Sequence, residues 1–148
     1  MSSKVPIAYI DIRTFAHATE DTDKVEAAVR NTLPAELIGT ITLVRSNLNG
    51  HHGNQIVLFE TRIKDKNAVQ KVFQKLSSEL SMMDKELLSG KIKLHLEKGN
   101  LYVRFDKQAA CMNVLRVCQT DPIHFKVHFK KHGADEVIEI CRKYGLIP

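Results

Sequence analysis

The segment Ile123-His124-Phe125-Lys126-Val127-His128-Phe129 alternates strictly between apolar side chains and basic or imidazole side chains. A period of two predicts a β-strand that buries one face and exposes the other. His124, His128 and His132 also fall at four-residue steps, which on a helix would suggest a metal site. The alternating β-branched and aromatic residues favour the strand. We therefore interpret the histidines as exposed strand residues and predict no metal or other cofactor.

Further strands are predicted on either side of this segment. Residues 91–97 and 101–106 alternate around Lys98-Gly99-Asn100 and predict a hairpin. Residues 39–45 and Gln55–Ile63 predict a second hairpin with a long tip over residues 46–54. Residues 5–17 predict a long first strand, with Ala8 among its inward side chains, and residues 112–117 a further short strand.

Helical periodicity appears in three places. The acidic cluster at residues 19–23 predicts the start of a helix that ends before Pro34. The clearest helix has one apolar stripe, and the pattern continues as a second or extended helix to about Gly90. The stripe consists of Ala68, Val69, Val72, Phe73, Leu76 and Leu80, continued by Met83 and Leu87. A final helix has Ala134, Val137, Ile138, Cys141 and Tyr144 inward, with Gly145 as its cap. Hairpins mixed with helices predict a single α+β domain over residues 1–148, with an antiparallel sheet and helices packed on one face.

Composition narrows the functional classes. Hydrophobic residues make up 43% and charged residues 26% of the 148-residue chain, which is typical of a globular protein, and the net charge of +5 favours phosphate-bearing partners. The three cysteines form no C-x-x-C pair, which argues against a disulfide framework or zinc site. The N-terminus lacks a signal peptide pattern, and no stretch approaches the ~20 apolar residues of a membrane helix, so we expect a cytoplasmic location and no membrane partner. P-loop, G-x-S-x-G, Rossmann and H-E-x-x-H motifs are missing, and we predict no enzymatic activity.

The predicted strand phases bring basic and aromatic side chains to one face of the sheet. These are Lys91, Lys93, His95, Tyr102, Arg104, His124, Lys126 and His128. Cations neutralise phosphates, and an exposed Tyr or His can stack on an unpaired base. The pattern is therefore typical of an RNA-binding surface, although a plain solvated face or a protein-binding face would also place polar residues there.

Two short segments add candidate contacts. The glycines of Gly50-His51-His52-Gly53-Asn54 permit positive φ and close approach to a ligand. Its flanks are predicted strands, which excludes an RNA-clamping KH loop. The histidines contact nucleic acid, hydrogen-bond within the turn or ligate a metal, although no third ligand lies at a recognised spacing. In Asp106-Lys107-Gln108, Asp106 is predicted to cap a short helix while Lys107 and Gln108 reach solvent or phosphate.

Three segments together resemble a family of small archaeal RNA-binding proteins that are described as predicted exosome subunits. They are residues 17–25, beginning His17-Ala18-Thr19-Glu20-Asp21, then 50–54, and 102–110, Tyr102-Val103-Arg104-Phe105-Asp106-Lys107-Gln108-Ala109-Ala110. The resemblance runs over most of the chain and implies a fold similar to the large-subunit ribosomal protein that contacts 5S RNA. The family pattern often has proline after the hairpin Asn, whereas this chain has Gln55.

The sequence therefore predicts a non-catalytic RNA-binding protein, with a role in RNA processing or degradation and exosome subunits as partners implied by the resemblance. Backbone contacts are predicted for Lys93, Arg104, Lys107 and Lys126, stacking for His95 and Tyr102, and loop contacts for His51, His52 and Asn54. The alternatives are a protein–protein adaptor that docks through the basic face and a metal-independent ribonuclease that uses His and Lys. An exposed sheet edge would permit a homodimer.

Overall fold

The computed structural model describes residues 5–50, 53–130 and 132–148, and in them a six-stranded antiparallel sheet runs across the molecule. Its strands are β1 (Ile7–Ala16), β2 (Val44–Asn49), β3 (Gln55–Ile63), β4 (Leu96–Glu97), β5 (Asn100–Phe105) and β6 (Ile123–Phe129). The spatial order is β2-β3-β1-β6-β5-β4, so that strands from opposite ends of the chain, β1 and β6, pair in the middle.

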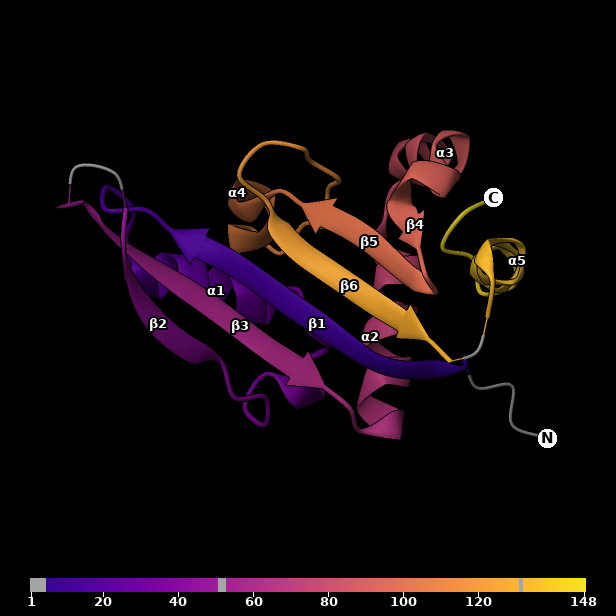
Figure 1. The fold of residues 1–148 in the computed structure, drawn as a ribbon, viewed down its shortest axis with the longest axis horizontal. Coiled ribbons are helices and arrows are strands. Elements are labelled where there is room, and N and C mark those ends of the chain that lie inside the picture. The colour runs from indigo at the N-terminus through magenta and orange to yellow at the C-terminus, as the bar shows by residue number, and fades with distance from the viewer. Residues whose placement is uncertain (1–4, 51–52, 131) are drawn as a thin grey trace.

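Helices cover one side of this sheet. They are α1 (Thr22–Asn31), α2 (Lys66–Glu79), α3 (Met82–Gly90), α4 (Lys107–Cys111) and α5 (Ala134–Lys143), with short 3₁₀ helices η1 (Ala35–Leu37) and η3 (Ile92–His95). Figure 1 shows α1 and α2 behind the strands, while the side of the sheet toward the viewer carries no helix of the described chain. The predicted α+β class with an antiparallel sheet is confirmed. Of the helices described, none has the length and apolar character needed to cross a bilayer.

The core lies between the sheet and the helices. Alternate residues of the central strands are buried, and Ile12 and Val127 are both 0% exposed. The rings of Phe105 and Phe125 meet edge to face with centroids 5.1 Å apart. From the helix side, Phe73 of α2 packs into the same cluster. Burial of these apolar residues determines which side chains of each strand face the helices. Every second side chain of β1, β5 and β6 therefore lies on the opposite face of the sheet.

Local signals set the helix ends. The Asp21 carboxylate accepts hydrogen bonds from the backbone N–H groups of Asp23 and Lys24 and caps α1, as the acidic cluster predicted. Asp106 caps α4 through the N–H of Gln108. Gly145 has a φ of +82° just beyond α5, and its predicted capping role is confirmed.

The predicted strand at residues 39–45 is wrong in position. Strand β2 is Val44–Asn49, which includes residues assigned above to the hairpin tip. The guanidinium of Arg30 donates to the carbonyls of Ile38 and Ile41 at 2.7 and 3.0 Å. These bonds hold the segment after η1 against α1, away from the sheet.

The predicted strand at residues 91–97 is also wrong. Only Leu96 and Glu97 pair with β5, because the preceding residues form η3 directly after α3. Leu94, predicted to be inward, is 83% exposed, and Lys91 and Lys93 are exposed but lie outside the sheet. The tight turn does form, with Lys98 and Gly99 at φ values of 51° and 79°.

The apolar stripe of α2 does not continue into α3. Leu80 is extended, and Ser81 starts a new helix by accepting from the N–H of Asp84. The new phase exposes Met83 and Leu87 and buries Leu88 together with Asp84, whose carboxylate accepts from the N–H of Val117 at 3.0 Å. A separate cap therefore resets which helix face is inward.

Smaller corrections concern the other elements. Residues 112–117 form only one isolated bridge, Val117 to Phe105, instead of a strand. A register shift between Ile7 and Tyr9 in the pairing of β1 with β6 buries Ile7 and leaves Ala8 only half-buried. Ala134, predicted to be inward, is exposed at the start of α5.

Candidate functional site

The helix-free side of the sheet, called the open face below, is built from outward side chains of four strands. The cross-strand register places Arg13 of β1 opposite His124 of β6, which lies opposite Arg104 of β5. A neighbouring row contains Arg62, Asp11, Lys126 and Tyr102, one each from β3, β1, β6 and β5. Since directly opposed residues in an antiparallel pair have Cβ atoms about 5 Å apart, each row is a contiguous strip of side chains.

The cations of the open face differ in their partners. Arg62 makes a bidentate ion pair with Asp11, with N–O distances of 2.7 and 2.8 Å. Within the described residues, Arg13, Arg104 and Lys126 have no carboxylate within ion-pair distance. Their positive charges are therefore available to an external anion.

Aromatic rings on the face are also of two kinds. The ring of Tyr9 stacks on His128 with centroids 4.8 Å apart, and the Arg62 guanidinium lies 4.0 Å from its centroid. Because β1 lies between β3 and β6, these two neighbours occupy opposite sides of Tyr9. Tyr102 is half-exposed and lines a hollow of the face, so its ring is better placed than that of Tyr9 to stack on a base.

That hollow has a volume of about 440 Å³ and is lined by Asp11, Arg13, Tyr102, Arg104, His124, Phe125 and Lys126. It gathers, beside Tyr102, the three cations that have no carboxylate partner among the described residues. Burial, reinforced by the charges of Arg104 and Arg13, lowers the pKa of His124 below 6.5. The surroundings of His124 therefore favour the neutral form of its imidazole in the free protein.

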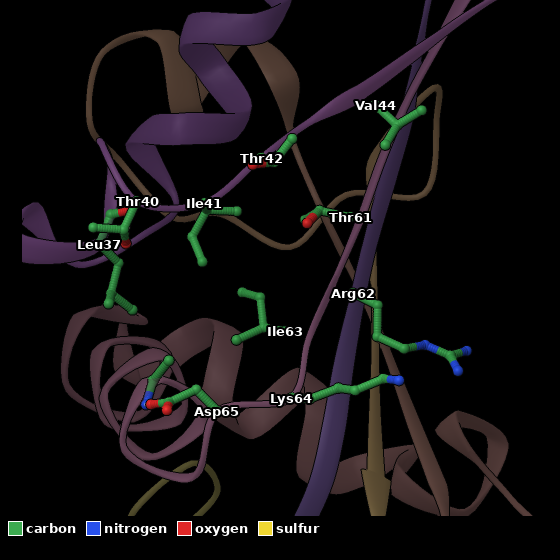
Figure 2. Close-up of a pocket in the computed structure, with 11 residues that line it drawn as sticks. Leu37, Thr40, Ile41, Thr42, Val44, Thr61, Arg62, Ile63, Lys64 and Asp65 are labelled. Carbon is green, nitrogen blue, oxygen red and sulfur yellow. The ribbon is translucent and has the colours of Figure 1, made fainter.

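A second hollow, of about 600 Å³, lies beside the end of β3, next to the segment that leads into β2. Figure 2 shows Leu37, Ile41 and Ile63 around it, while the side chain of Arg62 points away. Without converging cations, this hollow does not have the chemistry of a phosphate-binding site.

The prediction that Lys107 reaches solvent or phosphate is wrong, because its side chain is buried. Its side chain is 8% exposed, and its ammonium donates to the Phe15 carbonyl at 2.7 Å and lies 3.0 Å from Glu20 and 2.8 Å from Asp121. His17 lies 2.9 Å from the other oxygen of Asp121. Burial opposes ionisation of Asp121, but hydrogen bonds from Lys107 and His17 outweigh it and lower the pKa of Asp121. Lys107 thus supplies the positive charge that the two carboxylates require.

Comparison with known proteins places the chain in a family. A family model described as RNA binding matches residues 9–129. The chain belongs to this RNA-binding family. It is 32% identical over 133 residues to the RNA-binding protein PAB1135 of Pyrococcus abyssi, covering 88% of this chain and 86% of the relative. It is 33% identical over 139 residues to the uncharacterized protein MJ0213 of Methanocaldococcus jannaschii, covering 88% and 93% of the two chains.

Solved structures share the fold. Protein AF2318 from Archaeglobus fulgidus superposes with a TM-score of 0.78 at 23% identity, covering 93% of this chain and 99% of the other. Mth689 from Methanothermobacter thermautotrophicus gives a TM-score of 0.73 at 27% identity, covering 94% and 98%. The fold is therefore that of a group of archaeal proteins.

The structure brings together only part of the predicted site. Tyr102, Arg104 and Lys126 line one hollow, and the His95 ring, through Nδ1, bonds to the Tyr102 carbonyl at 2.9 Å at the edge of the sheet. Lys93 lies apart on η3.

The remaining predicted residues lie off the hollow. Gln108 is exposed on α4, and Asn54 is exposed at the hairpin tip, where its carbonyl accepts from Gly50. His51 and His52 lie outside the described residues.

Sequence reasoning missed Arg13 and left His124 out of the site. Arg13 alternates in phase with Tyr9 and Asp11, and that signal places it on the outward side of the first strand. Its cross-strand neighbour in the hollow, however, is His124 of β6, more than a hundred residues along the chain. The missing information was therefore the strand order.

Proposed function

We propose that the chain binds RNA through the open face and does not catalyse a reaction on it. The observation that carries this proposal is the hollow where Arg13, Arg104 and Lys126, without carboxylate partners among the described residues, surround Tyr102. Phosphate contacts by such cations supply most of the affinity of sequence-independent binding, and an aromatic ring adds stacking on a base. Membership of the RNA-binding family supports RNA as the ligand.

The experiment is a titration of labelled single-stranded RNA with the protein at several salt concentrations. Arg104→Ala/Lys126→Ala removes two unpaired cations from the face, and we expect the log–log salt slope to become shallower by about 1.4 and affinity to fall about tenfold or more. The control Lys66→Ala/Lys71→Ala removes the same charge from exposed positions of α2, on the other side of the sheet. Equal effects of the two double variants would contradict a site on the open face.

The same samples test the absence of catalysis. RNA recovered from the titration should keep its length on a denaturing gel. Shortened RNA would favour the ribonuclease alternative.

The resemblance to predicted exosome subunits supports a finer proposal, that the protein is an accessory factor of RNA degradation. A purified exosome core should then be retained by the immobilised protein. Retention that survives nuclease treatment would indicate direct protein contact, as the adaptor alternative requires, whereas retention lost with nuclease would indicate bridging by RNA.

A further inference from the structure

Two arginines flank one imidazole at the centre of the open face. Arg13 and Arg104 lie on opposite sides of His124 in one cross-strand row, and all three line the same hollow. The backbones of β1 and β5 are two strand spacings, about 10 Å, apart, so two long side chains of like charge converge on the space above His124. An arrangement of this kind becomes favourable once an anion lies between them.

Internal partners leave both guanidiniums available. The Arg104 guanidinium donates to the neutral amide oxygen of Gln119 at 3.2 Å, and that of Arg13 lies 5.7 Å from the Phe15 ring centroid. Glu60 is opposite Arg13 on β3, but no ion pair within 4.0 Å joins them in the described structure. Neither arginine therefore makes an ion pair with a carboxylate of the described residues.

We propose that Arg13, His124 and Arg104 form a seat for one phosphate group of bound RNA. The inference rests on the proposed function and assigns a defined place to one phosphate. Guanidinium forks match phosphate oxygens in a bidentate way, and the imidazole that lies between them can add a third N–H donor. The phosphate is either the end of an RNA chain or an internal phosphodiester.

Occupation of the seat has a consequence for His124. In the free protein, burial and the two guanidiniums lower its pKa, and Asp121 opposes this shift. Asp11 and Lys126 also line the hollow, and Asp11 is already paired with Arg62. A phosphate would neutralise the arginines and favour the imidazolium, so RNA binding should take up a proton at His124. Affinity should accordingly fall as pH rises through the interval between the free and the bound pKa of His124.

The test is nuclear magnetic resonance of the histidine rings in the free protein and with a saturating ten-nucleotide oligouridylate at low salt. We expect RNA to raise the pKa of His124 by about 1 unit or more. His128, on the same strand and face, is the internal control, and its ring should respond less. Arg13→Gln and Arg104→Gln should each weaken binding, and the double variant should be little weaker than either, because both side chains hold the same phosphate.

Each outcome bears on a different claim. If RNA binds without raising the pKa of His124, or shifts the pKa values of His124 and His128 equally, the proposed phosphate seat is wrong, whereas the proposal of RNA binding stands. Folded protein that binds no RNA at low salt overturns both proposals. Comparison of 5′-phosphorylated with 5′-hydroxyl RNA separates the sources: a response restricted to the former indicates a chain end, and equal responses indicate an internal phosphate.

Discussion

Replacement of Lys107 by methionine tests whether this residue holds the fold together or contacts RNA. The substitution keeps most of the aliphatic chain and removes the ammonium that joins the end of β1, the turn before α1 and the loop before β6. It leaves the Phe15 carbonyl and two carboxylates without their shared donor.

The size of the effect follows from burial. Removal of one partner from a fully buried ion pair costs about 3–5 kcal/mol. Here the ammonium is buried, but the carboxylates of Glu20 and Asp121 are 30% and 41% exposed and can be rehydrated. We therefore expect the free energy of unfolding to fall by about 2–3 kcal/mol, equivalent to a Tm lower by about 5–10 °C for a chain of this length.

Urea denaturation followed by circular dichroism measures this difference. Lys71→Met is the matched control, since Lys71 is 48% exposed and lies 3.8 Å from Glu36, and it should cost less than about 1 kcal/mol. Well below its melting temperature, Lys107→Met should bind RNA as the unmodified protein does. A stability within about 0.5 kcal/mol of the unmodified protein, or RNA binding lost while the fold is intact, would refute the reasoning.

Three further outcomes are expected. Gly99→Ala should lower the free energy of unfolding, measured by urea denaturation, by about 1–2 kcal/mol. The reason is that Gly99 has a φ of +79° and an added Cβ would lie 3.2 Å from a backbone oxygen of β6. The control Gly90→Ala, where an added Cβ would have no atom within 4 Å, should be neutral or stabilising. Burial raises the pKa of the Cys141 thiol to about 12, so iodoacetamide at pH 8 should alkylate exposed Cys111 and spare Cys141 until the protein unfolds, as peptide mass mapping would show. Asp121→Asn should destabilise the protein at neutral pH, because folding lowers the pKa of Asp121. The contribution of this carboxylate to the free energy of unfolding is present above about pH 4 and is lost as pH falls through the pKa of the folded state. The urea unfolding curves of the variant and the unmodified protein should therefore converge in acid.

Local patterns in the sequence were sufficient for elements whose environment is uniform along their length. Strand β6 alternates because one whole face is buried, and α2 shows a single stripe because it lies against the sheet throughout. The segment over residues 91–97 has the same alternation, yet η3 forms there because α3 ends directly before it. Alternation predicts a strand only where a neighbouring strand is available to pair, and strand order is not a local property.

Which charges of the candidate site are paired could likewise not be predicted from local sequence. The outward phases of Tyr102, Arg104 and Lys126 could be read from the sequence, but the pairing state of each cation could not. The partners of Lys107 are a carbonyl and a carboxylate about ninety positions earlier and a second carboxylate fourteen positions later. Exposure of a lysine cannot be inferred from its flanking residues when its partners are so distant.

The distribution of carboxylates explains how a chain with a modest net charge of +5 can gather cations without ion-pair partners on the open face. Asp11, the acidic side chain that lines the hollow, is held by Arg62, and Asp121 and Glu20 are held by Lys107. These pairs neutralise three carboxylates near the hollow and leave Arg13 and Arg104 without an ion-pair partner among the described residues, although Glu60 lies opposite Arg13 on β3. The local field therefore depends on which charges are paired and much less on their sum. It follows that Arg62→Gln, which would release Asp11 into the hollow, should weaken RNA binding although Arg62 itself already has a partner.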